Sequence, residues 1–167
     1  MLSVSVANSP EDFNAAGVLC GALGDWDAAT HQANGIAPEI VTGLFHSQTP
    51  ASLADRFSGP HSAMLLARWD GAPAGCIAFE PFDETADEIH KFYVDPAFRR
   101  KGIGGRLMQD LLAVLNARGK PRTLLQTSLY MSDAIATYRA FGFGLCAPFR
   151  PVPDILRPTE IFMSRPA

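Results

Sequence analysis

The spacing of apolar residues changes from a period of two to a helical period soon after the start of the chain. Residues 2–7 alternate between apolar and polar side chains, which predicts a short strand. Ser9 and Pro10 then indicate a helix start, because a hydroxyl can cap the first turn and proline suits its first position. Apolar residues continue at helical spacing, so we expect a helix over about 10–23.

The segment 24–60 has no single period, because Gly, Pro, Asn and Thr interrupt it. Two runs within it, 38–47 and 51–57, have the spacing of short helices. After this segment, two apolar runs flank an Asp-Gly pair, which is preferred in tight type I′ turns. We therefore expect a hairpin over 61–82.

Strands and helices follow one another regularly in the second half of the chain. The elements expected there are a strand over 88–94, a helix over 102–118 that ends at Gly119, a strand over 122–128, a helix capped by Ser132 that ends at Gly142, and two short strands around a proline-rich connection over 143–164. We find no internal repeat and no linker, so we expect residues 1–167 to form a single domain.

Composition and charge favour one folded domain with a buried core. Hydrophobic residues make up 47% of the chain and charged residues 19%, and the net charge is −3, which argues against general binding to nucleic acid. We also expect no membrane partner and no signal peptide, because no window has the required length or pattern. The cysteines, Cys20, Cys76 and Cys146, are odd in number and widely spaced. This spacing is typical of reduced thiols in a cytoplasmic protein, and we expect no metal site.

Three cationic residues lead directly into a glycine-rich helix start in the stretch "RRKGIGG", residues 99–105. Glycine weakens a helix by about 1 kcal/mol, so three glycines in four positions need an explanation. A helix N-terminus presents N–H groups without partners and a partial positive charge, and it therefore binds anions. Glycine lets the backbone approach such an anion closely. The sequence therefore predicts a phosphate group at the start of the 102–118 helix. A solvated basic turn is the alternative.

Two common phosphate-binding patterns are absent. The Walker pattern requires Ser or Thr after Gly-Lys, but Pro121 follows Gly119-Lys120. The dinucleotide pattern G-x-G-x-x-G requires a third glycine where this chain has Leu107.

Two stretches, "EIHKFYVDPAFRRKGIGGRLM" (88–108) and "AIATYRAFGF" (134–143), resemble the motifs of the GNAT superfamily of acyl-CoA-dependent N-acetyltransferases. The resemblance implies an α/β (α+β) fold, with a central, mixed, mostly antiparallel, splayed sheet of six to seven strands and about four helices. It also implies acetyl-CoA (coenzyme A) as cofactor, with its pantetheine arm in the splayed gap and its diphosphate on the glycine-rich loop. The cofactor-binding residues that it implies are Phe92, Tyr93, Val94, Arg99, Arg100, Lys101, Gly102, Ile103, Gly104, Gly105 and Arg106.

Acyl transfer to an amine requires a base that keeps the amine neutral and an acid that protonates the leaving thiolate. By match to the family, Glu88 would be the base and Tyr138 the acid. The alternatives are a solvent-exposed strand end for Glu88 and a packing role for Tyr138. His90 lies two residues after Glu88, on the same strand face, and could relay a proton. The chain departs from the family at Met131, where many members carry an asparagine that bonds the pantetheine.

We therefore expect an N-acetyltransferase that moves acetyl from acetyl-CoA to a primary amine by direct attack in a ternary complex. The alternative is an acyl-CoA-binding sensor without turnover. We expect the acceptor site in residues 24–60 and 144–160, and a homodimer is common among members of the family. A peptide amino terminus, a polyamine, an amino acid and an antibiotic all remain open as acceptors. The polar or aromatic candidates are Asp25, Trp26, Asp27, His31, Glu39 and His46.

Overall fold

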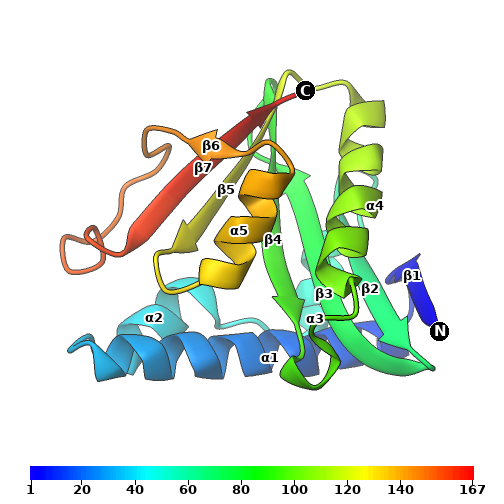
Figure 1. Ribbon diagram of the computed structural model, residues 1–167, viewed down its shortest axis with the longest axis horizontal. Helices are drawn as coiled ribbons and strands as arrows, with labels where there is room; N and C mark the ends of the chain where they lie inside the picture. The colour runs from blue at the N-terminus through cyan, green and yellow to red at the C-terminus, as the bar shows by residue number, and fades with distance from the viewer.

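A seven-stranded sheet forms the centre of the structure, a computed structural model that describes residues 1–167 (Figure 1). The strand order is β1-β2-β3-β4-β5-β7-β6, and every neighbouring pair is antiparallel except β4 and β5. This mixed, mostly antiparallel sheet confirms the expected fold class. The strands are β1 (Leu2–Val6), β2 (Ala63–Trp69), β3 (Ala72–Pro81), β4 (Ala86–Val94), β5 (Arg122–Ser128), β6 (Gly144–Leu145) and β7 (Glu160–Pro166).

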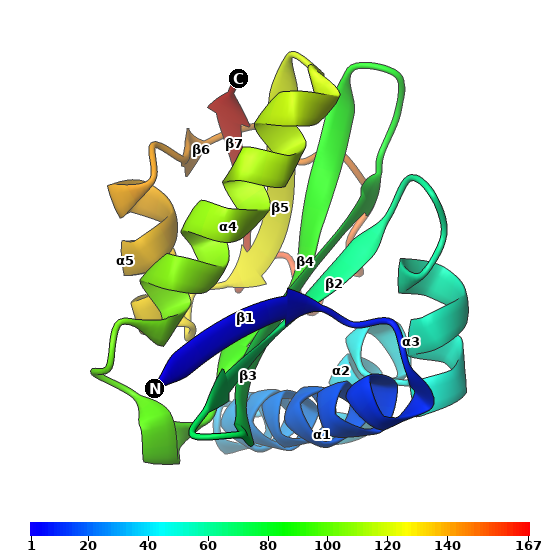
Figure 2. The same ribbon diagram turned by 90° about the vertical axis from the view of Figure 1, so that its right-hand side faces the viewer.

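Helices cover both faces of the sheet (Figure 2). One buried cluster packs α4 and α5 onto one face, and a second packs α1 and α3 onto the other. The helices number five, as the residue spacing indicated, compared with the about four that the family resemblance implied: α1 (Pro10–Ala33), α2 (Pro38–Phe45), α3 (Pro50–Phe57), α4 (Ile103–Arg118) and α5 (Ser132–Ala140). None of them combines the length and the apolar character that crossing a membrane would require.

Helix α1 continues ten residues beyond its expected end at residue 23 and reaches Ala33. The prediction was wrong because it treated Gly24 as an interruption. A Cβ on Gly24 would lie 2.9 Å from the Cβ of His46, so this glycine lets α1 pack closely against the segment after α2. The extension carries Trp26, Asp27 and His31 along one side of the sheet.

The parallel pair β4 and β5 separates part-way along its length (Figure 1). The two strands pair from Ala86 with Arg122 to Ile89 with Leu125, and no pairing continues beyond this point. β4 begins at Ala86, two residues before its predicted start, and its last residues pair only with β3. The splayed gap that the family resemblance implied is therefore present, and it lies beside residues 92–94.

Local capping and turn predictions have mixed outcomes. The hydroxyl of Ser9 accepts a hydrogen bond from the Asp12 amide at 3.1 Å, as expected. Asp70 and Gly71 have φ of +49° and +84°, which confirms the type I′ turn. Ser132, however, is the first residue of α5 and not its cap. The Ile135 amide bonds to the carbonyl of Met131 at 2.9 Å, so Met131 is the cap residue of this helix.

Replacing Gly75 with alanine should destabilise the fold by about 1–3 kcal/mol. Gly75 lies in β3, where a Cβ would stand 2.8 Å from the Tyr93 carbonyl oxygen and 3.2 Å from Leu107, so β4 or α4 must shift. Urea unfolding measures the effect. Gly21→Ala is the matched control, because a Cβ there meets nothing within 4 Å inside α1, and it should stabilise by up to about 1 kcal/mol. Equal stability of the two variants would contradict the expectation.

Candidate active site

The N-terminus of α4 presents backbone amides without partners. Gly102 caps the helix in the left-handed conformation, with φ +76°, and it offers no side chain to the first turn. The first backbone hydrogen bond of the helix runs from the Arg106 amide to the Gly102 carbonyl, at 3.1 Å. The amides of Ile103, Gly104 and Gly105 therefore project freely from the helix end.

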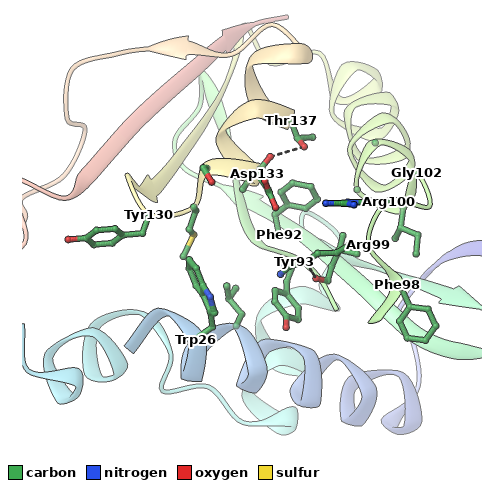
Figure 3. Close-up of a pocket in the computed structure, with 18 residues that line it drawn as sticks. Trp26, Phe92, Tyr93, Phe98, Arg99, Arg100, Gly102, Tyr130, Asp133 and Thr137 are labelled. Carbon is green, nitrogen blue, oxygen red and sulfur yellow. Dashed lines mark hydrogen bonds between the residues drawn. The ribbon is translucent and has the colours of Figure 1, made fainter. Parts of the chain in front are cut away.

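These three residues line a cavity of about 580 Å³ beside the end of β4, beyond the point where β4 and β5 stop pairing (Figure 3). Four segments build it: the end of β4, the loop into α4, the start of α5 and one side of α1. Its lining residues are Leu23, Trp26, Phe92, Tyr93, Val94, Phe98, Arg99, Arg100, Gly102, Ile103, Gly104, Gly105, Tyr130, Met131, Ser132, Asp133, Ala134 and Thr137.

Most of the predicted cofactor-binding residues line this cavity, but two do not. The Lys101 ammonium lies 4.7 Å from the centre of the Trp69 ring, on β2. The Arg106 guanidinium bonds to Asp110 one turn further along α4, at 2.9 Å. Both side chains point away from the cavity, so any part they play in binding stays a prediction. Arg99 and Arg100 remain as its cationic lining.

The cavity suits an anionic group with an extended arm. Glycine at position 104 leaves space in the cavity beside the Phe92 ring, because a Cβ there would lie 3.3 Å from that ring. Along β4, the Tyr93 carbonyl faces Gly75 of β3. Since backbone groups alternate along a strand, those of Phe92 and Val94 face the gap. The Val94 carbonyl already accepts a hydrogen bond from Arg99 Nε at 3.1 Å.

A second, smaller cavity of about 130 Å³ adjoins the first. Both cavities are lined by Leu23, Phe92 and Met131, which therefore lie between them. The segments 24–60 and 144–160, in which we expect the acceptor site, both contribute to the second cavity. Its assignment to the acceptor stays a prediction. Its other lining residues are Asp27, Phe45, His46, Glu88, Ile89, His90, Lys91, Gln126, Thr127, Ser128, Tyr138, Arg150 and Glu160.

Tyr138 lies in the wall of the second cavity. It is 5% exposed, and its ring packs 5.6 Å from that of Phe92 and 5.9 Å from that of Phe143. Burial raises the pKa of the Tyr138 phenol well above its ordinary value. The hydroxyl therefore keeps its proton at neutral pH and can donate it.

Glu88 is buried, at 2% exposure, and is not at a solvent-exposed strand end. Its carboxylate accepts hydrogen bonds from both terminal nitrogens of Arg150, at 2.7 and 2.5 Å, and His90 Nε2 lies 3.3 Å away. Burial raises its pKa, but hydrogen bonds from His90 and Arg150 outweigh this effect and hold the pKa below its ordinary value. The carboxylate is therefore ionised and already paired.

Glu88 belongs to a chain of polar side chains that crosses the sheet from β3 to β7. Consecutive contacts along it include 3.1 Å from His90 to Glu80, 3.0 Å from Arg150 to Gln126 and 2.9 Å from Gln126 to Glu160. Its members in order are Arg56, Glu80, His90, Glu88, Arg150, Gln126 and Glu160.

Sequence reasoning identified only Glu88 and His90 in this chain and missed its other five members. Gln126 offered no clear signal, because it follows two leucines in its strand and precedes two hydroxyl residues, Thr127 and Ser128. Arg150 and Glu160 stand among prolines and strand-forming residues, where no local pattern distinguishes them from surface charges.

The sequence matches the family model described as "Acetyltransferase (GNAT) family" over residues 26–143, which is more than half of the chain. The chain therefore belongs to the GNAT acetyltransferase family. This match spans both motifs, the α4 N-terminus and most of the two cavities.

Relatives of this GNAT acetyltransferase carry related names. It is 35% identical over 109 residues to the IAA acetyltransferase of Azospirillum brasilense, covering 64% of this chain and 69% of that protein. It is 33% identical over 97 residues to the N-alpha-acetyltransferase RimI of Mycobacterium tuberculosis, covering 56% of this chain and 60% of that protein. The chain is accordingly an N-acetyltransferase by family, whereas these two names indicate different acceptors.

Solved structures confirm the fold of this GNAT acetyltransferase. The PaiA N-acetyltransferase of Thermoplasma acidophilum, crystallised with coenzyme A, superposes with a TM-score of 0.74 at 16% identity, covering 99% of both chains. An acetyltransferase of the GNAT family from Staphylococcus aureus also reaches 0.74, at 14% identity, again covering 99% of both chains.

Proposed function

We propose that this acetyltransferase transfers the acetyl group of acetyl-CoA to a primary amine by direct attack in a ternary complex. One observation carries the proposal: two cavities meet at Leu23, Phe92 and Met131, one with free helix amides and the other lined by ionisable side chains. Such a junction lets an acyl donor and an amine enter from different sides and meet. Acetyl-CoA, when bound, supplies an acetyl thioester that a neutral amine can attack.

The larger cavity holds the donor in this proposal. The amides of Ile103, Gly104 and Gly105 bind its diphosphate, as helix N-termini bind phosphates generally. Arg99 and Arg100 add positive charge beside them. The backbone of residues 92–94, which β5 leaves unpaired, receives the amides of the pantetheine arm.

Tyr138 is the acid in this proposal, and Glu88 is the base that the family resemblance implies. The Tyr138 hydroxyl is protonated at neutral pH because it is buried, and it is the proton donor for the departing sulfur. The assignment of Glu88 as the base stays a prediction. Its pairing with Arg150 limits how readily the carboxylate could act as a base. Glu88 must loosen two hydrogen bonds before it can accept a proton.

A thiol-release assay tests the proposed function. Acetyl-CoA is incubated with a panel of primary amines, namely an amino-terminal peptide, a polyamine, an amino acid and an aminoglycoside, and free thiol is followed over time. We expect thiol release that depends on at least one amine, with an equal amount of acetylated amine by mass spectrometry. Tight binding of coenzyme A by calorimetry, without thiol release for any amine, would instead support the sensor function and contradict this proposal.

The cytoplasm remains the proposed location, and a homodimer remains the proposed assembly. Sedimentation analysis of the full chain distinguishes a monomer from a dimer directly.

A further inference from the structure

We propose that the amine acceptor binds as its ammonium ion in the smaller cavity, between Asp27 and Glu160, and that Glu160 is the base that accepts its proton. This inference rests on the proposed function and names the substrate class of the same site: primary aliphatic amines that are protonated in solution. It assigns the base to β7 rather than to β4.

The pairing of charges in the smaller cavity distinguishes Glu160 from the other two carboxylates that line it. Glu88 is paired with Arg150, at 2.5 Å. Asp27 accepts a hydrogen bond on Oδ2 from His46 Nε2, at 2.8 Å. Glu160 forms no ion pair, and its side chain accepts a hydrogen bond only from the neutral amide of Gln126, at 2.9 Å. Its carboxylate is therefore the one available to a cationic ligand.

Asp27 supplies a second, independent sign that the cavity is built for a donor. It is 3% exposed, and its Oδ1 has no hydrogen-bond partner in the structure. His31, one turn further along α1, donates from Nδ1 to the Asp27 carbonyl at 2.9 Å, and the same nitrogen lies 3.2 Å from Asp27 Oδ1 without forming a hydrogen bond to it. A buried acceptor without a donor is costly, and an ammonium group would remove that cost.

Burial makes the Glu160 carboxyl a weaker acid, and its carboxylate is therefore a stronger base. The pKa of Glu160 is about 7, compared with its ordinary value of 4.5. Burial is the largest cause of the rise, and the charge of Asp27 adds to it, while the hydrogen bond from Gln126 and the charge of His31 lower the pKa. A base is most effective when its pKa lies near the working pH. The other ionisable groups around the cavity are Asp27, His31 and His46 from α1 and the segment after α2, and Glu88, His90, Lys91, Tyr138 and Arg150 from β4, α5 and the connection before β7.

The size of the cavity limits what can enter. Its volume of about 130 Å³ is well below the roughly 300 Å³ at which drug-sized sites begin. The cavity therefore admits the amino end of an acceptor and a few attached atoms, while the remainder of a larger acceptor must stay outside.

The proton balance of the step closes with these residues. Glu160 accepts one proton from the ammonium, and the neutral nitrogen then forms the N–C bond to the acetyl carbon while the C–S bond breaks. The sulfur takes the hydroxyl proton of Tyr138. A second proton of the nitrogen returns to the Tyr138 oxygen, and Glu160 releases its proton to water after product leaves.

The test compares Glu160→Gln with Glu88→Gln in steady-state assays from pH 5.5 to 9, using an amine identified in the thiol-release panel. In the wild type, kcat/KM should rise as Glu160 ionises near pH 7. Glu160→Gln should lose this inflection, and its kcat should fall about 100-fold. Its affinity for coenzyme A, measured by calorimetry, should stay the same. Glu88→Gln should keep the inflection. If Glu160→Gln retains the inflection and Glu88→Gln loses it, the proposal is overturned.

Asp27→Asn tests the binding half of the inference. It should raise KM for the amine at least about tenfold and leave KM for acetyl-CoA within about twofold, because it removes the charge that faces the ammonium while the asparagine oxygen can still accept the hydrogen bond from His46. Equal KM for the amine in this variant and the wild type would overturn the ammonium site. A wild type that acetylates no amine would contradict the proposed function itself. A wild type active on amines with an unaltered Glu160→Gln profile would overturn this inference alone.

Unfolding in urea provides a readout of Glu160 that needs no activity. A carboxyl group whose pKa is higher in the folded state than in the unfolded state stabilises the fold at pH values below its unfolded-state pKa. This stabilisation is lost as the pH rises through the folded-state pKa. The free energy of unfolding of the wild type, relative to Glu160→Gln, should therefore fall between about pH 4.5 and 7. A flat difference over this range would contradict the raised pKa on which the base assignment depends.

Discussion

Gly104→Asp should lower the affinity for coenzyme A at least about 100-fold, which corresponds to roughly 2.7 kcal/mol. The new carboxylate would stand in the first turn of α4, beside the amides that we assign to the diphosphate. It would repel the phosphates and could itself accept hydrogen bonds from those amides. Because an acidic residue in the first turn stabilises a helix, the loss of binding should occur without unfolding. Calorimetric titration with coenzyme A measures the affinity, and circular dichroism checks the fold.

Gly104→Ala separates charge from bulk in this experiment. Its methyl group would lie 3.3 Å from the Phe92 ring, as the Cβ of aspartate does, but it carries no charge. We expect alanine to weaken binding much less than aspartate and to show less dependence on salt concentration. If the affinity of Gly104→Asp for coenzyme A is within about tenfold of that of the wild type, diphosphate binding at α4 is refuted.

Tyr138→Phe should lower kcat about 100-fold and leave KM for acetyl-CoA within about twofold. Phenylalanine keeps the ring contacts with Phe92 and Phe143, so the wall of the second cavity keeps its shape. Only the hydroxyl proton is lost, and with it the donor for the departing sulfur. Steady-state kinetics with the amine found in the panel measures the effect.

Tyr130→Phe is a matched control for this change. Tyr130 lines the larger cavity and packs edge-on against His31, at 5.2 Å, away from the wall formed by Tyr138. Removal of its hydroxyl should therefore reduce kcat far less than Tyr138→Phe does. Unchanged turnover in Tyr138→Phe would leave this tyrosine with a packing role only.

Several features of this acetyltransferase depend only on residues that are close together in the chain, so the sequence by itself determined them. The Ser9 cap and the Asp70-Gly71 turn are examples, because each depends on hydrogen bonds or backbone angles a few residues apart. The boundaries of α4 at Gly102 and Gly119 belong here too, since both glycines are left-handed. The family and its fold followed from the same local motifs around this helix.

Other features depend on which distant residues meet, and only the tertiary structure decided them. α1 continues through Gly24 because His46 packs there, which no pattern within the helix indicates. Lys101 turns to Trp69 instead of the cavity, although it stands in the basic motif.

The chemical character of the carboxylates was likewise decided by the tertiary structure, because a pKa depends on burial and on partners from other elements. Glu88 looked like a free base in the sequence, but folding buries it against Arg150. Glu160 was not singled out in the sequence, and folding places it in the same cavity as Asp27 without an ion-pair partner. The motif near α4 therefore identified the family, while the arrangement of acids and bases around the acceptor emerged only when β7 and α1 were brought together.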